Sequence, residues 1–92
     1  MPKIYFAPRF NKAYLKFTKL NQKRIDAIDR IIKLFASNPK HPSLNLEKLV
    51  GVKIWTIRID RSNRLFFAWS DQEDTALFFF VGPHDSYKTI KK

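Results

Sequence analysis

Residues 54–69 alternate between apolar and polar side chains, and this pattern limits the fold more than any other feature of the chain. An alternation of period two is typical of β-strands that bury one face and leave the other open. It runs along residues 55–60 and resumes at residue 64, so the polar residues 61–63 predict a hairpin turn. A three-residue turn keeps odd positions opposite odd positions. It predicts three buried cross-strand pairs: Trp55 with Trp69, Ile57 with Phe67 and Ile59 with Leu65.

Charged side chains gather on the open face of this predicted hairpin. Arg58 and Arg64 point to the same side, and Asp60 is expected opposite Arg64. Guanidinium groups bind phosphate oxygens through two parallel hydrogen bonds, so two arginines on a rigid sheet favour a phosphate ligand. The alternative is a solvated face with one cross-strand ion pair, which stabilises an exposed sheet by only about 0–1 kcal/mol.

The charge of the chain indicates the kind of partner. Its 92 residues are expected to form one domain over residues 1–92, and 18 Lys and Arg against 8 Asp and Glu give a net charge of +10. Such an excess on a small domain favours a polyanionic partner. We expect nucleic acid first, an acidic protein second and a membrane surface last, because the apolar faces of the expected helices are needed elsewhere.

Several other classes of protein are disfavoured by the composition. The chain has no cysteine, which fits a reducing cytoplasm and leaves no thiolate ligand. Its two histidines, His41 and His84, are far apart in the sequence without a third ligand nearby, so we expect neither a metal nor another cofactor. No apolar run approaches the roughly 20 residues that cross a bilayer, so we expect no association with a membrane.

Two helices are expected before the hairpin. Pro8 suits the first position of a helix, and apolar residues follow it at helical spacing. Asn21 is a good cap for a second helix, which should end before residues 38–39, an Asn-Pro pair. An ion pair between Asp26 and Arg30 is expected on the surface of this second helix.

The order of the elements predicts an α+β fold, β-α-α-β-β-β. A short strand at residues 3–7 should join an edge of the sheet, and the continuous apolar run 76–81 should be a strand buried on both faces. The last three strands then form an antiparallel sheet, with the helical hairpin packed on one face. Residues 39–53 read as a loop that leucines attach to the body, so that Glu47 and Lys48 project outward.

Five segments of the chain together resemble one family of proteins. They are, in order, His41-Pro-Ser-Leu, Glu47-Lys-Leu-Val-Gly51, Trp55-Thr-Ile-Arg-Ile59, Arg64-Leu-Phe-Phe and Val81-Gly-Pro-His-Asp-Ser-Tyr87. With this order of elements and this charge, the chain resembles the RelE/ParE superfamily of bacterial toxins over nearly its whole length. The resemblance implies a toxin with a cognate acidic antitoxin. In the RelE branch it implies cleavage of mRNA in the ribosomal A site without a metal, and in the ParE branch inhibition of DNA gyrase.

Cleavage of RNA without a metal needs a base for the 2′-hydroxyl, cations for the phosphate and an acid for the leaving 5′-oxygen. Glu47 is the available base, Arg58 and Arg64 are the cations, and His84 is the acid, because histidine can give a proton near neutral pH. Tyr87 is placed to orient the phosphate or to stack on a base. The resemblance marks the positions of Arg58 and Arg64 as catalytic in RelE-type nucleases. It also implies that His84 and Tyr87 correspond to a C-terminal His and Tyr found in several of these nucleases.

The remaining basic side chains near these positions are expected to bind the RNA. They are Lys48, Lys53, Arg61 and Lys88. Thr56 departs from the pattern of the family, since some members carry a lysine at that strand position. We favour the RNA-cleaving branch, because a toxin that only binds a protein does not need Arg64, His84 and Tyr87 together. A gyrase inhibitor and a non-catalytic RNA- or protein-binding module are the alternatives.

Overall fold

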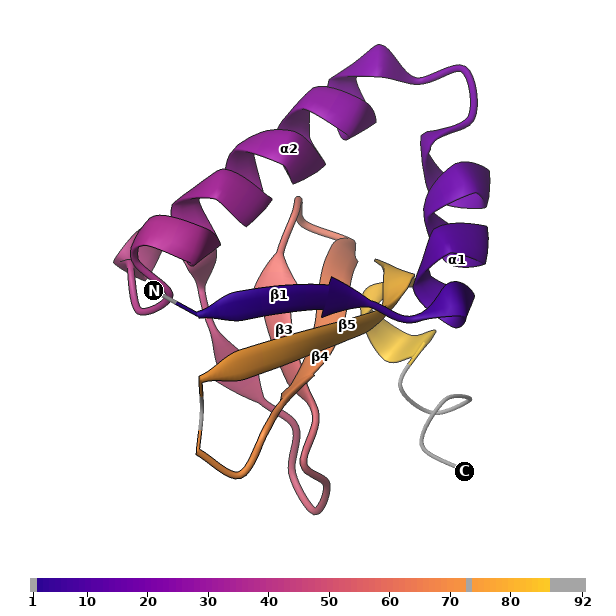
Figure 1. Cartoon of the computed structure of the whole chain (residues 1–92). Coiled ribbons are helices and arrows are strands. Elements are labelled where there is room, and N and C mark those ends of the chain that lie inside the picture. Colours follow the sequence, from indigo (N-terminus) through magenta and orange to yellow (C-terminus); the bar gives the residue numbers. More distant parts are fainter. Residues whose placement is uncertain (1, 73, 87–92) are drawn as a thin grey trace.

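The computed structural model describes residues 2–72 and 74–86 and has the predicted α+β architecture, with two helices against one face of a sheet (Figure 1). The helices are α1 (Pro8–Thr18) and α2 (Gln22–Ser37). The strands are β1 (Lys3–Phe6), β2 (Glu47–Lys48), β3 (Trp55–Arg58), β4 (Asn63–Trp69) and β5 (Thr75–Pro83), in the order β1-β5-β4-β3-β2. Short 3₁₀ segments cover Pro42–Leu44 and His84–Ser86.

The structure shows which strands form the two edges of the sheet. β1 pairs in parallel with β5, so the first strand forms one edge of the sheet and the apolar strand β5 is an interior strand. At the other edge, Glu47 and Lys48 form strand β2 on β3, although a loop was expected there. The hydroxyl of Thr56 lies 3.5 Å from the carbonyl oxygen of Glu47 and donates to it. A two-residue strand is too short to show a periodic pattern, so the sequence carries no signal for it.

Local signals for the helix ends are confirmed. Pro8 occupies the first turn of α1, and the side-chain oxygen of Asn21 accepts from the backbone N–H of Arg24 at 3.1 Å. α2 ends at Ser37, immediately before the Asn-Pro pair. Neither helix in the described part of the chain is both long and apolar enough to cross a membrane.

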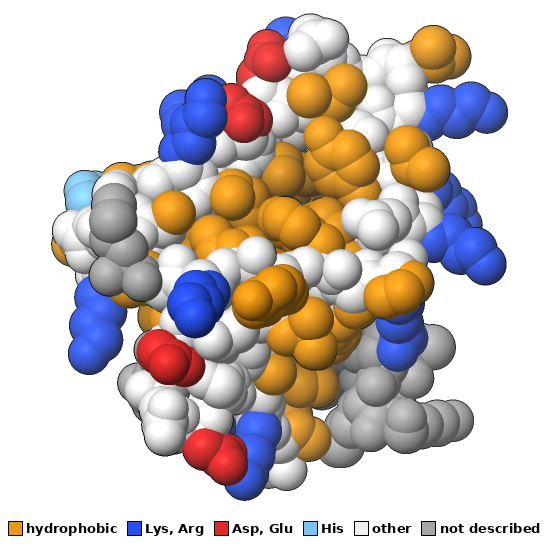
Figure 2. Space-filling model, in the orientation of Figure 1, with side chains coloured by type: hydrophobic (Ala, Val, Ile, Leu, Met, Phe, Trp, Pro, Cys, Tyr) orange, Lys and Arg blue, Asp and Glu red, His pale blue; other side chains and the backbone are white. Residues whose placement is uncertain are grey.

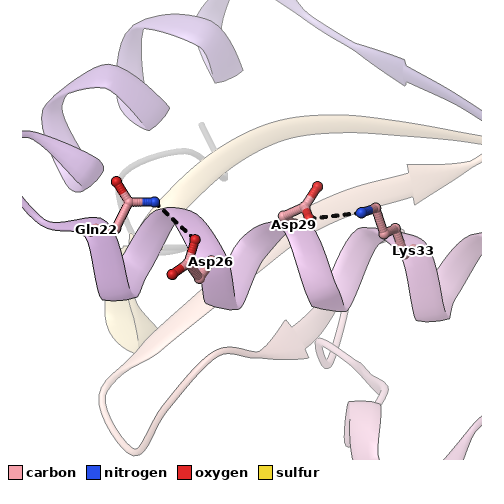
Figure 3. A network of polar contacts seen from close by, with 4 residues as sticks. All are labelled: Gln22, Asp26, Asp29 and Lys33. Carbon is pink, nitrogen blue, oxygen red and sulfur yellow. Dashed lines mark hydrogen bonds and ion pairs between the residues drawn. The ribbon is translucent and has the colours of Figure 1, made fainter.

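The expected ion pair between Asp26 and Arg30 is wrong. The carboxylate of Asp26 instead accepts from the side-chain amide of Gln22, one turn earlier, at 2.9 Å (Figure 3). The ion pair on this helix joins Asp29 to Lys33 at 3.0 Å. Side chains four residues apart in either direction are neighbours on a helix, so spacing alone does not select the partner. Both side chains of the pair are largely exposed, and it contributes little to stability.

The main core lies between the two helices and the face of the sheet that carries Ile57, Leu65 and Phe67, as the alternation predicts. Phe35 of α2 is fully buried at its centre. Its ring centroid lies 5.1 Å from that of Phe67 and 5.5 Å from those of Trp69 and Phe78. Edge-on and stacked rings at these distances attract one another beyond the burial of their surface.

The helices diverge from their connecting turn instead of packing side by side along their length (Figure 1). A groove of about 520 Å³ therefore opens between them and β1, and its apolar floor is visible in Figure 2. Two aspartates of α2 lie among its otherwise mainly apolar lining: Phe6, Phe10, Asn11, Tyr14, Ile25, Asp26, Ile28, Asp29 and Ile32.

The register of the β3–β4 hairpin differs from the prediction by two residues. Odd positions do face odd positions, but the pairs are Trp55 with Phe67 and Ile57 with Leu65, and Arg58 lies opposite Arg64. The turn consists of residues 59–62 instead of 61–63. Both registers bury the same apolar face, so the alternation does not distinguish them.

The second face of the sheet is only partly open. Phe66, expected on the open face, is fully buried in a second cluster with Leu49, Val52, Ile54, Phe79 and Phe80, because residues 49–54 fold over it. A bulge in β5 supports this arrangement: Phe66 pairs with Phe80 but Phe67 pairs with Phe78, which leaves Phe79 as the extra residue. β5 is therefore not buried on both faces throughout, and Leu77 is 43% exposed.

Candidate functional site

A small pocket on the face opposite the helices collects three of the predicted site residues from three neighbouring strands. Glu47 of β2, Arg58 of β3 and Arg64 of β4 line it with Asn45 and Leu46, and its volume is about 270 Å³. Residues of adjacent strands that point to one face lie next to one another, so the sheet itself brings these charges together.

A second pocket adjoins the first through Glu47. It has a volume of about 170 Å³ and is lined by Glu47, Lys48, Leu49, Val50 and His84. We call the two pockets together the Glu47 site. Four of the five predicted catalytic residues line it. None of the predicted site residues that the structure describes lines the larger groove between the helices.

Arg58 and Arg64 occupy directly opposed positions on β3 and β4. Like charges in such positions repel each other, and an anion between them relieves the repulsion. Arg58 is exposed, whereas Arg64 is only 8% exposed. The pair therefore combines one exposed and one buried arginine side chain, and the chemistry of both guanidinium groups suits a phosphate.

The fixed position of Arg64 comes from backbone carbonyl groups. Its Nη1 donates to the carbonyl oxygens of Asp60 at 2.8 Å, Asn63 at 3.1 Å and Arg61 at 3.4 Å. The predicted ion pair between Asp60 and Arg64 is wrong, because the two-residue shift in register moves Asp60 into the turn. Arg64 is bound by the carbonyl groups of that turn instead of by its carboxylate.

The carboxylate of Asp60 closes the turn. It accepts from the backbone N–H groups of Ser62 and Asn63, both at 2.9 Å, and from the side-chain amide of Asn63 at 3.0 and 3.1 Å. Partial burial acts to raise the pKa of Asp60, but the hydrogen bonds from Asn63 and Ser62 outweigh it, with a smaller effect of Arg24, and lower the pKa. Asp60 is therefore ionised at neutral pH.

His84 follows β5 directly and begins the short segment His84–Ser86. Its backbone N–H donates to the carbonyl oxygen of Ser62 at 2.7 Å, which ties the end of β5 to the β3–β4 turn. The imidazole is exposed and lines the second pocket. A group that must exchange a proton with a substrate has the access that such a position provides.

The other predicted site residues are distributed around the Glu47 site. Lys48 lines its second pocket. Arg61 is exposed in the β3–β4 turn, and Lys53 is exposed in the segment that covers Phe66. Tyr87 and Lys88 lie outside the described residues.

Sequence reasoning missed the role of Asn45 in this site and of Asp60 in the turn beside it. Asn45 lines the first pocket with a φ of +48°, a left-handed conformation that asparagine tolerates better than most residues. Asp60 was assigned to an ion pair instead of a turn. The signal that was available for it is an Asp-x-x-Asn spacing, since Asp side chains accept from backbone N–H groups two residues ahead.

The second histidine, His41, has a structural role. Its Nδ1 accepts from the backbone N–H of Ser43 at 3.1 Å and lies 2.8 Å from the hydroxyl of Ser43, and so caps the segment Pro42–Leu44. Within residues 2–72 and 74–86, no group of three or more His, Cys, Asp and Glu is placed to hold a metal ion.

Comparison with known proteins finds similar solved structures but no similar curated sequence. No protein-family model and no curated protein sequence matches the chain. Among solved structures, the chain is similar to the YoeB/ParE toxin from Agrobacterium tumefaciens, with a TM-score of 0.74 and 17% identity over 89% of this chain and 98% of that one. It is also similar to YafQ from E. coli, with a TM-score of 0.71 and 14% identity over 94% and 97%.

A third similar structure contains a partner protein. In the heterotetrameric YoeB-YefM toxin-antitoxin complex from Staphylococcus aureus, the matching chain has a TM-score of 0.71 and 21% identity over 91% of this chain and 98% of that one. The fold of this chain is therefore that of the YoeB and YafQ toxins, and the resemblance to RelE/ParE toxins is confirmed at the level of the fold.

Proposed function

We propose that this protein is the toxin of a toxin–antitoxin pair and an endoribonuclease that cleaves mRNA in the ribosomal A site. The observation that carries this proposal is the Glu47 site, whose two adjoining pockets share the carboxylate of Glu47. Two guanidinium groups line one pocket, and an imidazole lines the other. These are the group types that the cleavage of RNA by its own 2′-hydroxyl requires.

The proposed reaction uses the protein's own side chains. The carboxylate of Glu47 takes the proton of the 2′-hydroxyl, and the 2′-oxygen attacks the adjacent phosphorus. Arg58 and Arg64 stabilise the negative charge that builds up on the phosphate oxygens. The imidazolium of His84 gives its proton to the 5′-oxygen as the bond from phosphorus to that oxygen breaks. The products are a 2′,3′-cyclic phosphate and a free 5′-hydroxyl.

Additional contacts with the RNA backbone are assigned to exposed cations around the site. Lys48 lies in it, and Lys53 and Arg61 lie on the segments that border it. Tyr87 as a phosphate-orienting or stacking residue and Lys88 as a phosphate contact remain predictions. Because such contacts release counterions, ribosome binding should weaken steeply as salt increases.

We expect the ribosome to position the mRNA, because the Glu47 site is too small to select an RNA sequence by itself. Two pockets of about 270 and 170 Å³ give this domain little surface to read an RNA sequence. We therefore expect slow cleavage of free RNA and fast cleavage of mRNA that is being translated in the cytoplasm. Equal rates on naked and translated RNA would contradict the ribosomal part of the proposal.

The partner that controls this activity is proposed to be a small acidic antitoxin. A net charge of +10 favours an acidic segment that covers or displaces the Glu47 site. The apolar groove between α1 and α2 offers such a partner a surface for an amphipathic segment. Pull-down from the native host at moderate salt should recover a small acidic protein. Recovery of nucleic acid alone would count against a toxin–antitoxin pair.

His84→Gln is the sharpest test of the reaction. Glutamine preserves the size and polarity of the side chain but cannot act as the acid, so single-turnover cleavage of A-site mRNA should fall by about 10²–10⁴-fold. Ribosome and antitoxin binding should persist. His41→Gln is the matched control, because His41 lines neither pocket, and its rate should stay within about threefold of the wild-type rate.

Arg64→Ala should reduce both cleavage and ribosome binding, because it removes a phosphate contact. Arg30→Ala, which removes the same charge from the exposed surface of α2, is its control. If His84→Gln and Arg64→Ala both arrest growth as strongly as the wild type, the reaction proposed here is wrong. A DNA supercoiling assay would then test gyrase inhibition as the function.

A further inference from the structure

The β3–β4 turn, residues 59–62, lies between two groups that the proposed reaction uses. Four hydrogen bonds converge on the carboxylate of Asp60 from Ser62 and Asn63, at 2.9 to 3.1 Å. Asn63 in turn is largely buried, and its carbonyl oxygen accepts from the backbone N–H of Ile59 at 3.0 Å. The side-chain hydrogen bonds of Asp60 and the backbone hydrogen bond from Ile59 to Asn63 therefore both restrict the conformation of the turn.

Carbonyl groups of this turn, and that of Asn63 directly after it, bond to residues on both sides of the site. Those of Asp60, Arg61 and Asn63 accept from Nη1 of Arg64. That of Ser62 accepts from the backbone N–H of His84 at 2.7 Å. One closed turn thus contacts the guanidinium assigned to the phosphate and the backbone of the residue assigned to the leaving group.

We propose that Asp60 is a positioning residue for the cleavage reaction: by closing the turn, its carboxylate holds Arg64 and His84 at a fixed separation across the scissile phosphate. This inference rests on the proposed function. Asp60 itself lines neither pocket of the Glu47 site and acts through the backbone of the turn. Proximity effects depend steeply on geometry, so loss of the turn should reduce the rate without removing any catalytic group.

The proposal distinguishes hydrogen bonding from charge. Asparagine at position 60 keeps the acceptor oxygen that Ser62 and Asn63 use, and it removes the negative charge. Alanine removes both. If Asp60 acted as the counterion of Arg64, Asp60→Asn and Asp60→Ala would be equally impaired. If it acts by closing the turn, asparagine should restore most of the function.

The first measurement is single-turnover cleavage of A-site mRNA over a range of ribosome concentrations. In Asp60→Ala, the maximal rate should fall by about 10–100-fold, because a misplacement near 1 Å can cost about 100-fold. The half-saturating ribosome concentration should not rise, because Arg58 and Arg64 are retained. In Asp60→Asn, the rate should stay within about threefold of the wild-type rate. Asp71→Ala removes an equal charge from the turn between β4 and β5, at the far end of the hairpin, and should cleave normally.

The second measurement does not depend on activity. The His84 amide is bonded to Ser62, so its hydrogen exchange by NMR should be faster in Asp60→Ala than in the wild type, and near wild type in Asp60→Asn and Asp71→Ala. If the wild type cleaves no RNA, the proposed function fails, and the exchange data alone decide whether Asp60 holds the turn. If the wild type cleaves and Asp60→Ala cleaves equally well, or if asparagine is as impaired as alanine, the positioning role is overturned.

Discussion

Arg64→Lys is the substitution whose outcome depends most directly on the geometry of the site. Within the described part of the chain, the three hydrogen bonds of this guanidinium all start from Nη1 and end on carbonyl groups of the turn. The remaining nitrogens of the same group are the ones that can meet a phosphate in the pocket that Arg64 lines. A lysine ammonium has a single nitrogen, so it can bind the carbonyl groups or reach the phosphate, but not both.

Loss of the bonds to the carbonyl groups affects stability, loss of the phosphate contact affects the rate, and the two effects differ in size. Hydrogen bonds from a charged donor each contribute about 1.5–3 kcal/mol, but the carbonyl groups of the exposed residues Asp60 and Arg61 regain water when the donor is lost. Arg64→Ala should therefore lower the free energy of unfolding by about 1–3 kcal/mol in total, and lysine should retain most of that stability. Removal of one preorganised donor to a transition-state oxyanion lowers the rate by about 10²–10³-fold, and both substitutions should show this loss.

Urea denaturation and single-turnover cleavage of A-site mRNA, measured on the same preparations, separate these effects. Arg58→Lys is the matched control, since Arg58 is exposed and its lysine can follow the phosphate, and its loss should be near tenfold or less. The reasoning is refuted if Arg64→Lys cleaves within about threefold of the wild type. It is equally refuted if lysine destabilises the protein as much as alanine does.

Three further predictions concern stability and its dependence on pH. Phe35→Ala should lower the free energy of unfolding in urea by about 3–5 kcal/mol, because it removes a fully buried ring with three aromatic neighbours, whereas Leu15→Ala on the exposed face of α1 should change it by less than about 0.5 kcal/mol. Leu20→Gly should raise the same quantity by about 1 kcal/mol, because Leu20 is 99% exposed with a φ of +53°, and a lower value would contradict this account. The lowered pKa of Asp60 means that its ionised form stabilises the fold above the ordinary carboxyl value of 3.8, and that this stabilisation is lost as the pH falls through the lower folded value. The difference in unfolding free energy between the wild type and Asp60→Asn should therefore shrink below pH 3.8, and a difference that stays constant with pH would exclude the effect.

The sequence alone determined the elements and the faces of the sheet. Period-two alternation placed Ile57, Leu65 and Phe67 on the buried side and Arg58 with Arg64 on the other, because side-chain direction along a strand is a local property. Pro8 and Asn21 also located the starts of the two helices from the sequence, since the cap and the first turn involve only neighbouring residues.

The tertiary structure decided which of two equivalent registers the hairpin adopts. A shift of two residues preserves every side-chain direction, so burial is the same in both registers, and the hydrogen bonds of Asp60 with Ser62 and Asn63 close the four-residue turn. It also decided that Phe66 is buried, because the segment 49–54 folds over a face that the alternation left open.

The Glu47 site is the clearest product of the tertiary structure. Sequence reasoning selected Glu47, Arg58, Arg64 and His84 by the chemistry that each side chain can supply. Their meeting depends on β2 pairing with β3 and on the hydrogen bond that ties His84 to the β3–β4 turn. Neither contact is local in the chain, and both form only when the strands assemble. Local chemistry therefore identified the candidates, and long-range contacts placed them around two adjoining pockets.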